Sequence, residues 1–362
     1  MQTCCTIVPM VNHNEQSIQD THARGLRTKG HSALTRRPLW GISIAMLTVL
    51  ILTACQAPAL PVPFVPTPTA TVLPTETPEP LPPVSTGLDT SRLGMMDRDV
   101  VYCTMDGVPL EMDIYYPERA ESAWAAVMYV HGGGWTTGDK TRGAGIEEIP
   151  ALVNAGFLTV AINYRMAPEH VFPAMIEDVR CAVRFLRAHA SQYNLDPQRI
   201  GAYGGSAGGH LVALLGTAGD QTAWDVGEYL WESSRVQAVA DYFGPTDLTE
   251  PEFNAGMGET KLHTFGAQDR FDPVFAAASP VTYVTPDDPP FLIVHGDKDD
   301  AVPLLQSEIL FALLQEANVP SELLIVQNAG HGLYPTGEEP MRPTRGVVIH
   351  RVVNFFLEEL LR

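Results

Sequence analysis

The pattern of apolar and polar residues predicts a regular series of strands and helices from about residue 100 onward. Residues 100–117 alternate around Asp106-Gly107, which predicts an antiparallel β-hairpin. Short apolar runs follow, each of a length typical of a buried strand. These runs cover residues 124–131, 157–165, 200–205, 236–244, 290–297 and 321–331.

Longer amphipathic stretches separate several of these runs and predict helices. Residues 173–193 place Ile176, Val179, Val183 and Leu186 three or four positions apart, on one helical face. Two further helices are expected at 304–317 and 345–362. Alternation of strands and helices predicts an α/β domain, in which helices cover both faces of a mostly parallel sheet. We assign this domain to residues 91–362.

The first 90 residues lack this pattern. An apolar run at residues 39–52 follows Arg36 and Arg37, and it is shorter than the roughly 20 residues that a membrane span needs. We therefore assign residues 1–55 to a signal segment, although an uncleaved anchor helix is the alternative. Residues 56–90 are rich in proline and threonine, which predicts an extended, disordered linker.

The run ends in "LTAC", and the segment resembles a bacterial lipoprotein signal. The resemblance implies cleavage before Cys55, lipid attachment to that residue, and an extracytoplasmic protein anchored to a membrane. Ordinary secretion, or anchoring by an uncleaved helix, remains the alternative. The stretch before Arg36 is long for such a signal, and translation from Met10 is one explanation.

Charge and cysteine content narrow the classes of function. The formal net charge is −19 and residues 90–362 hold no basic stripe, so we expect no nucleic-acid partner. Cys103 and Cys181 are the two cysteines of the predicted domain, and we expect them to be buried and unpaired. Their spacing is not that of a metal site, so we predict that the protein needs neither metal nor cofactor.

A serine lies among glycines at residues 204–208, between a predicted strand and a predicted helix. The segment "GGSAG" matches G-x-S-x-G, a tight turn that lifts a nucleophilic serine above a sheet. We expect glycine at positions 204 and 208 because a β-carbon there would collide with neighbouring backbone. A phosphate-binding loop would need a different spacing of glycines or a following lysine. We therefore predict that Ser206 is a nucleophile.

Three other segments supply the groups that a serine nucleophile requires. His331 follows a predicted strand and could remove the proton of the serine hydroxyl, while Asp299, after another strand, could orient the histidine. The glycine loop "HGGGW" begins at His131 and could offer backbone N–H groups to an oxyanion, at roughly 3 kcal/mol for each donor. Functional residues of parallel sheets gather at such strand ends.

These motifs together resemble the esterase and lipase branch of the α/β-hydrolases. The segments that carry the resemblance span about residues 95–362 and are "HGGGW", "NYRMAPEHVFPAMIEDV", "DPQRIGAYGGSAGGHLVALL", "YFGPTDL" and "HGDKDDAVP". The chain is most similar to the BD-FAE group, beside the hormone-sensitive-lipase-like esterases. Those esterases usually have an acidic residue at the position of Gly205, and this difference favours BD-FAE.

The resemblance implies an α/β-hydrolase fold with a small lid and a specific set of site residues. The triad would be Ser206, Asp299 and His331, in the chain order of that superfamily. The motif "HGDKDDAVP" places the acid at Asp299 and not at its acidic neighbours. The N–H groups of Gly133, Gly134 and Ala207 would form the oxyanion hole. His131 and the segment "YRMAPE" would support the loop.

The function we expect is hydrolysis of carboxylic esters with short or medium acyl groups, through an acyl-enzyme. Relatives remove acetyl or feruloyl groups from plant polysaccharides, which implies a carbohydrate ester as one possible substrate. Amide hydrolysis by the same triad, as in arylformamidases or peptidases, is an alternative, and a non-catalytic binding module is another. Residues 219–236 and 246–278 are expected to cover the site. The segment "WDVGEYLW", Phe253, Met257 and Phe265 are candidates for an acyl pocket, with ordinary packing as the alternative for the aromatic residues.

Overall fold

The structure is a computed structural model that describes residues 94–118, 122–219, 221–256 and 258–362. The predicted signal segment with Cys55 and the predicted linker lie outside these residues. The domain predicted for residues 91–362 is described from Gly94 onward. Among the described helices, none has the length and apolarity needed to cross a membrane.

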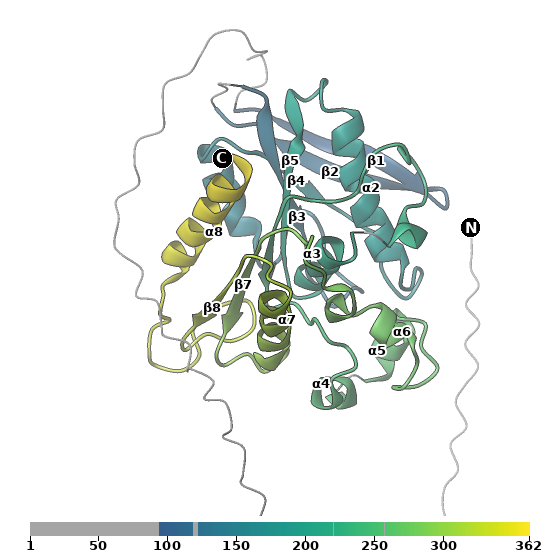
Figure 1. The fold of residues 1–362 in the computed structure, drawn as a ribbon, viewed down its shortest axis with the longest axis vertical. Coiled ribbons are helices and arrows are strands. Elements are labelled where there is room, and N and C mark those ends of the chain that lie inside the picture. The colour runs from purple at the N-terminus through teal and green to yellow at the C-terminus, as the bar shows by residue number, and fades with distance from the viewer. Residues whose placement is uncertain (1–93, 119–121, 220, 257) are drawn as a thin grey trace, which may run out of the picture. The chain divides into compact units, whose positions relative to one another are not determined.

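An eight-stranded mixed sheet occupies the centre of the fold, with the strand order β1-β2-β4-β3-β5-β6-β7-β8 (Figure 1). The pairs β1–β2 and β2–β4 are antiparallel, and all the other neighbours are parallel. The predicted hairpin and the predicted strands are confirmed, with shifts at their ends. The strands are β1 (Met96–Met105), β2 (Val108–Tyr115), β3 (Trp124–Val130), β4 (Leu158–Ile162), β5 (Leu195–Gly205), β6 (Ala238–Tyr242), β7 (Phe291–Gly296) and β8 (Ser321–Val326).

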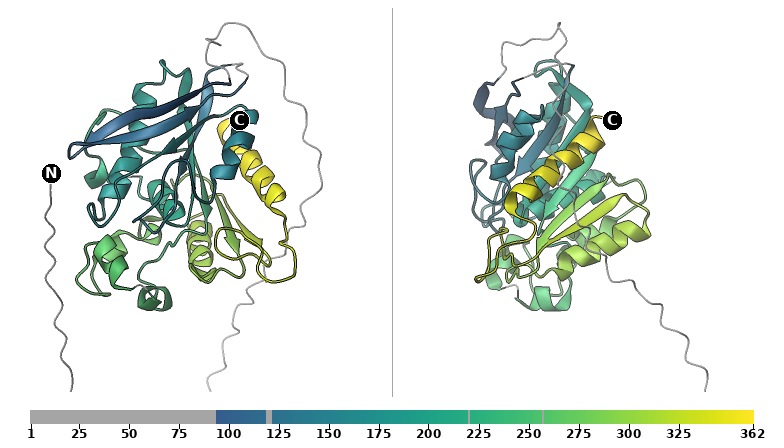
Figure 2. Two further views of the ribbon diagram at one scale, coloured as in Figure 1. Left: turned by 180° about the vertical axis from the view of Figure 1, so that it is seen from behind. Right: turned by 90° about the vertical axis from the view of Figure 1, so that its left-hand side faces the viewer.

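Helices cover both faces of this sheet, as the alternating pattern predicts. Figure 1 and Figure 2 show α2 and α8 on opposite sides of the sheet. The helices are α1 (Ile149–Asn154), α2 (Ala174–Ala188), α3 (Ala207–Thr217), α4 (Pro251–Gly256), α5 (Glu259–Thr264), α6 (Val274–Ala277), α7 (Leu305–Glu316) and α8 (Arg345–Leu360), with short 3₁₀ turns η1 (Ile146–Glu148), η2 (Thr222–Trp224) and η3 (Pro280–Tyr283).

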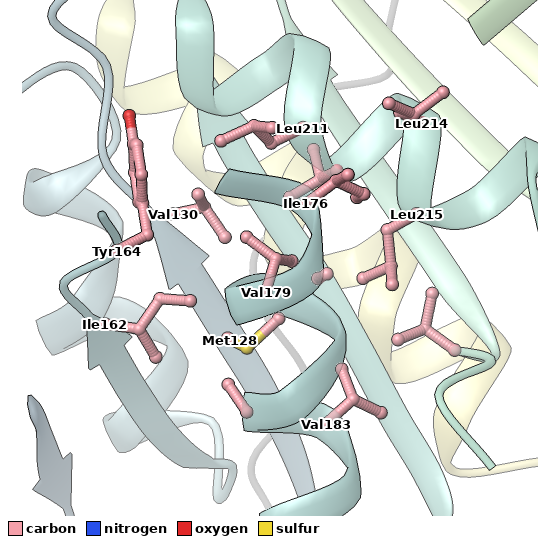
Figure 3. Close-up of a cluster of buried hydrophobic side chains, with 14 of the residues drawn as sticks. Met128, Val130, Ile162, Tyr164, Ile176, Val179, Val183, Leu211, Leu214 and Leu215 are labelled. Atoms are coloured by element: carbon pink, nitrogen blue, oxygen red, sulfur yellow. The ribbon is translucent and has the colours of Figure 1, made fainter. Parts of the chain in front are cut away.

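Alternate side chains of the central strands enter two separate cores. In β3, Met128 and Val130 pack with α2 and α3, whereas Val127 and Tyr129 point to the opposite core with α1 and α8. Figure 3 shows the first of these cores, where Ile176 and Val179 of α2 lie beside strand residues and leucines of α3. Burial on both faces explains why β3 is apolar at every position. The sheet is therefore a rigid platform for the loops at its ends.

The prediction that Cys103 and Cys181 are unpaired is wrong. The two residues form a disulfide bond between β1 and α2, with Cα atoms 6.5 Å apart, and both are buried. They lie 78 positions apart in sequence, but α2 packs against the edge of the sheet that contains β1. Spacing along the chain gives no information about this proximity, because the strand order creates it.

The segment between α3 and β6 lies along α2. Arg180 and Arg184 of α2 are buried and hold Asp225 at 2.8 and 2.7 Å. Arg187, one turn further along, donates hydrogen bonds to the carbonyl oxygens of Ser233 and Arg235. This part of the expected lid is therefore attached to a core helix through buried guanidinium groups.

The second part of the expected lid contains α4, α5 and α6, which lie together at one end of the described domain (Figure 1). This cap contacts the first turn of α3, because His210 hydrogen-bonds to the carbonyl oxygen of Ala278 at 2.7 Å. The contact brings the cap beside the turn that contains Ser206.

Candidate active site

Ser206 occupies a strained turn between β5 and α3. Its φ of 58° and ψ of −122° are unusual for a residue with a side chain. A β-carbon built on Gly204 would lie 2.5 Å from the carbonyl oxygen of Val130, and one built on Gly208 would lie 2.1 Å from the same atom. The two glycines are therefore needed because the turn presses against the end of β3, as the sequence analysis predicts.

His331 and Asp299 meet Ser206 in a continuous series of hydrogen bonds. Nε2 of His331 lies 3.0 Å from Oγ of Ser206, and Nδ1 lies 2.8 Å from Oδ2 of Asp299. Because an ionised carboxylate only accepts hydrogen bonds, Nδ1 carries the proton and Nε2 is free to accept the serine proton. Three segments that are distant in sequence are thereby joined in the geometry of a serine triad.

Asp299 is the acidic residue that is built into this site. Its side chain is completely buried, and Oδ1 accepts backbone N–H groups of Ala301 and Val302, each at 2.9 Å. Asp297, by contrast, is partly exposed, and Oδ2 of its carboxylate lies 3.6 Å from the amine of Lys298. The structure thus brings Asp299 to the histidine, whereas Asp297 makes no hydrogen bond to His331.

The surroundings of Asp299 keep it ionised. Burial would raise the pKa of its carboxyl group, but hydrogen bonds from His295, from His331 and from the N–H group of Val302 together hold this pKa well below its usual range. A permanent negative charge is what a triad acid needs in order to stabilise a protonated histidine. The environment therefore suits the role predicted for Asp299.

His295 is a supporting residue whose contacts the sequence does not reveal. It is fully buried at the end of β7, and Oγ of Ser307 donates to its Nδ1 at 2.7 Å. Its Nε2 lies 2.9 Å from the carbonyl oxygen of Val302 and 3.4 Å from Oδ2 of Asp299. His295 therefore fixes the loop that carries Asp299.

The glycine loop after β3 lies against the serine turn. A β-carbon on Gly132 would approach the carbonyl oxygen of Gly205 to 2.6 Å and Cβ of Ser206 to 3.3 Å. Among the described residues, no acceptor receives a hydrogen bond from the N–H groups of Gly133, Gly134 or Ala207. Two of these N–H groups belong to the glycine loop and the third to the residue after Ser206, and none is used within the described part of the chain.

Stacking and hydrogen bonds hold this loop in place. The ring of His131 stacks on Tyr164 with centroids 4.3 Å apart, and the hydroxyl group of Tyr164 donates to the carbonyl oxygen of His131 at 3.0 Å. The next residue, Arg165, is buried and donates to the carboxylate of Asp178 on α2. These contacts agree with the supporting role expected for His131 and for the "YRMAPE" segment.

Trp135 and His210 link the glycine loop to the cap. Nε1–H of Trp135 donates to Nδ1 of His210 at 3.1 Å, so Nε2 of His210 carries the proton and donates to Ala278. Burial lowers the pKa of His210 to about 4, which favours this neutral form. Phe265 completes the contact, with its ring 5.1 Å from that of Trp135. Sequence reasoning missed this link, because its partners come from three separate segments.

Two of the three candidate acyl-pocket phenylalanine and methionine residues are described by the structure, and both are buried. Phe265 is buried against Trp135 and Phe275, so it packs the cap onto the loop. Phe253 is also buried, with the amine of Lys261 lying 6.0 Å from its ring. Met257 lies outside the described residues.

No group of three or more histidine, cysteine or acidic side chains that could hold a metal ion occurs in the described part of the chain.

The chain is similar to known esterases in sequence and in structure. Esterase LipQ of Mycobacterium tuberculosis is 37% identical over 205 residues, which cover 56% of this chain and 48% of that protein. The match thus spans about half the length of this curated relative. A solved structure titled a truncated form of carbohydrate esterase from gut microbiota superposes with a TM-score of 0.63 and 29% identity, over 76% of this chain and 100% of the other.

A second similar solved structure contains a bound carboxylic acid. The butyrate-bound esterase Est2 of Thermogutta terrifontis has a TM-score of 0.61 and 25% identity, and the match covers 73% of this chain and 93% of that one. The profile of the BD-FAE family matches residues 112–314, which is more than half of the 362 residues. With the eight-stranded sheet and the serine turn already described, this match identifies the chain as a member of the BD-FAE family, with an α/β-hydrolase fold.

Proposed function

We propose that this protein is a carboxylic ester hydrolase with Ser206 as its nucleophile. One observation carries the proposal: Ser206, on its strained turn, forms a hydrogen-bonded series with His331 and Asp299. The N–H groups of Gly133, Gly134 and Ala207 have no acceptor among the described residues. The family membership and the similarity to esterases support the same reaction class.

The reaction would proceed through an acyl-enzyme. Oγ of Ser206 attacks the ester carbonyl carbon while Nε2 of His331 takes the hydroxyl proton, and the carbonyl oxygen becomes an oxyanion. The N–H groups of Gly133, Gly134 and Ala207 would stabilise this oxyanion. His331 then protonates the alcohol oxygen, and the alcohol leaves. Water attacks the acyl-serine in the same manner and releases the carboxylic acid and the free serine.

Asp299 and His331 have different roles in this mechanism. Asp299 stays ionised, because its hydrogen bonds lower the pKa of its carboxyl group, and it stabilises the imidazolium form of His331 without taking its proton. The Nδ1–H group of His331 is held by Asp299, so the ring keeps its unprotonated Nε2 toward Ser206.

We propose short or medium acyl groups as substrates, including acetyl or feruloyl groups on carbohydrate. The similar structures support this range, since one is titled a carbohydrate esterase and another holds butyrate. The test compares acetylated xylan, feruloylated oligosaccharides and p-nitrophenyl esters with aminoacyl anilides. Hydrolysis of the esters is expected, and preferential hydrolysis of the anilides would assign the triad to an amidase.

We further propose that Cys55 carries lipid and that the catalytic domain is anchored outside the cytoplasm. The apolar run at residues 39–52 and the cysteine that follows it support this proposal. The disulfide between Cys103 and Cys181 supports it independently, because disulfides persist mainly in oxidising compartments outside the cytoplasm.

A further inference from the structure

A small pocket lies next to the catalytic histidine, outside the triad and the glycine loop. Its volume is about 220 Å³, and its lining includes Gly332, Leu333 and Tyr334, which directly follow His331. Ala144 closes another side, and a β-carbon on Gly205 would lie 3.0 Å from its carbonyl oxygen. The pocket therefore adjoins both the base and the turn that carries the nucleophile.

The polar wall of the pocket is a fixed cluster of charges. Arg345, at the start of α8, donates from Nη2 to the buried carboxylate of Glu148 at 2.9 Å, and its Nε lies 3.3 Å from Oε2 of Glu147. The guanidinium group also lies 5.8 Å from the ring centre of Tyr242. These partners hold Arg345 in one position, so the polar groups of this wall are preorganised.

This wall suits a neutral polar ligand. Two carboxyl groups face one guanidinium group, and burial raises the pKa of the Glu148 carboxyl. With Arg345 compensated in this way, the wall has no excess positive charge to attract an anionic ligand. The carboxylate of Glu147 is more than half exposed, so it can accept hydrogen bonds from hydroxyl groups. Nη1 and Nε of Arg345 are themselves buried, so the carboxylate of Glu147 supplies the exposed polar contact of this wall. A purely apolar ligand would cover this carboxylate without offering it a hydrogen bond.

Tyr334 adds an aromatic surface to the same pocket. Its side chain is 64% exposed. Its ring lies over Gly332, where a β-carbon would approach Cε2 of the tyrosine to 2.8 Å. The carbonyl oxygen of Tyr334 accepts the N–H group of Gly330 at 2.9 Å, which ties the loop back on itself. The ring is therefore presented to the pocket by a constrained loop next to His331.

We propose that this pocket binds the alcohol moiety of the ester, and that it takes one neutral, polyhydroxylated ring such as a sugar unit. The inference rests on the proposed function, in which His331 protonates the leaving alcohol, so that alcohol must lie on the side of His331. The C–H face of a sugar ring would pack on Tyr334, and its hydroxyl groups would donate hydrogen bonds to the carboxylate of Glu147. The volume suits one ring, because pockets for drug-sized ligands start near 300 Å³.

The test uses two esters that share the acetyl group and differ in the alcohol. Ethyl acetate has an alcohol too small to fill the pocket, whereas a monoacetylated methyl xyloside fills it with a sugar ring. Both esters form the same acetyl-enzyme, so a residue that contacts only the alcohol changes the acylation step. The readout is the ratio of kcat/KM for the xyloside ester to kcat/KM for ethyl acetate, measured by pH-stat with the full chain.

Tyr334→Ala is expected to lower this ratio roughly tenfold, mainly through KM for the xyloside ester. Glu147→Gln keeps the shape of the side chain and is expected to lower the ratio about threefold or more. Tyr334→Phe keeps the ring and should retain most of the ratio. The matched control is Phe271→Ala, which removes an aromatic ring that is 87% exposed and belongs to a different pocket.

The possible outcomes separate the two proposals. An unchanged ratio in both Tyr334→Ala and Glu147→Gln would overturn the subsite and leave the proposed function standing. A fall in Tyr334→Phe as large as that in Tyr334→Ala would overturn the contact with the aromatic ring. If the wild-type protein hydrolysed neither ester, the proposed function would fail and the subsite with it.

Discussion

The backbone of Ser206 shows how a single residue can be constrained for chemistry. A φ of 58° is unfavourable for a residue with a β-carbon. The conformation persists because Gly204 and Gly208 let the turn press against the end of β3, and because the N–H group of Ser206 is bonded to the carbonyl oxygen of Tyr242 at 2.9 Å. The fold holds the hydroxyl group at His331 before any substrate arrives.

Ser206→Ala should abolish ester hydrolysis and preserve the fold. Alanine has the same β-carbon, so the turn keeps its strain and its contacts, while the nucleophilic oxygen is lost. We expect kcat to fall by more than about 10⁴-fold. Initial rates on p-nitrophenyl acetate measure the loss, and circular dichroism checks the fold. A variant that keeps a tenth of the activity would remove Ser206 from the mechanism.

Asp299→Asn should lower kcat about 10⁴-fold, because an amide at this position favours the wrong tautomer of His331. Asp297→Asn is the matched control, since it changes an acidic side chain two positions away that does not contact the histidine. Activity of the control close to that of the wild type is expected. The opposite ranking of the two variants would transfer the acid role to Asp297.

His210 should make stability depend on pH between about 4 and 6.5. Burial, with a smaller contribution from the charge of Lys261, lowers its pKa to about 4 in the folded protein, against about 6.5 for an exposed histidine. The unfolded chain therefore binds more protons in this range, and folding stability falls as the pH drops from 6.5 to 4. The loss amounts to about 3 kcal/mol.

Urea denaturation at several pH values tests this prediction by comparison of the wild type with His210→Gln. Buried carboxyl groups such as Asp241, whose pKa burial raises to about 6, titrate in the same range. They are common to both proteins and cancel in the difference. The free energy of unfolding should decrease less steeply in the variant, and parallel curves would contradict the assignment.

At the scale of elements, α2 is held from two sides. The disulfide ties it to β1, and Arg180 and Arg184 tie it to Asp225 in the segment that precedes β6. The start of α2 also carries Asp178, whose carboxylate holds Arg165 in the loop after β4. One helix therefore connects the sheet edge, the segment before β6 and the support of the glycine loop.

Removal of the disulfide should destabilise the domain by about 2–4 kcal/mol, because the bridge closes a long loop and restricts the unfolded chain. The Cys103→Ala/Cys181→Ala double variant is compared with the wild type by urea denaturation. Peptide mapping of the unreduced wild type should yield a linked pair of peptides that contain these two cysteines. Equal stability, or recovery of the two peptides unlinked, would contradict the prediction.

At the scale of the whole molecule, the parallel part of the sheet brings the candidate catalytic residues together at one edge. Ser206 follows β5, Asp299 follows β7 and His331 follows β8. Parallel strands place their carboxyl ends together, which is why residues from distant segments meet there. The cap adds contacts to this edge through Trp135 and His210.

Attachment of this domain to a membrane should depend on Cys55. If Cys55 carries lipid, the wild-type protein should incorporate radiolabelled fatty acid and fractionate with membranes. Cys55→Ser should lose the label and become soluble or remain unprocessed, while Cys4→Ser is the control and should behave as the wild type. Wild-type protein recovered in the soluble fraction without lipid would indicate ordinary secretion.

The sequence by itself determined the local features of this protein. A period of two residues indicated the hairpin of β1 and β2, and a spacing of three and four indicated α2, because side-chain periodicity records which face of an element is buried. The serine turn was also readable, because its glycines and its nucleophile are neighbours in the chain. The positions of Asp299 and His331 after strands were enough to nominate them, with the family resemblance selecting Asp299 over Asp297.

Only the tertiary structure decided which distant residues meet. It paired Cys103 with Cys181, attached the segment before β6 to the arginines of α2, and placed His295 behind Asp299. It also built the pocket of Tyr334 and Arg345 beside His331. These contacts follow from the order of strands in the sheet and from the packing of helices on its faces. The pattern of apolar and polar residues within one element does not predict that order, because the same helix or strand can pack against many different partners.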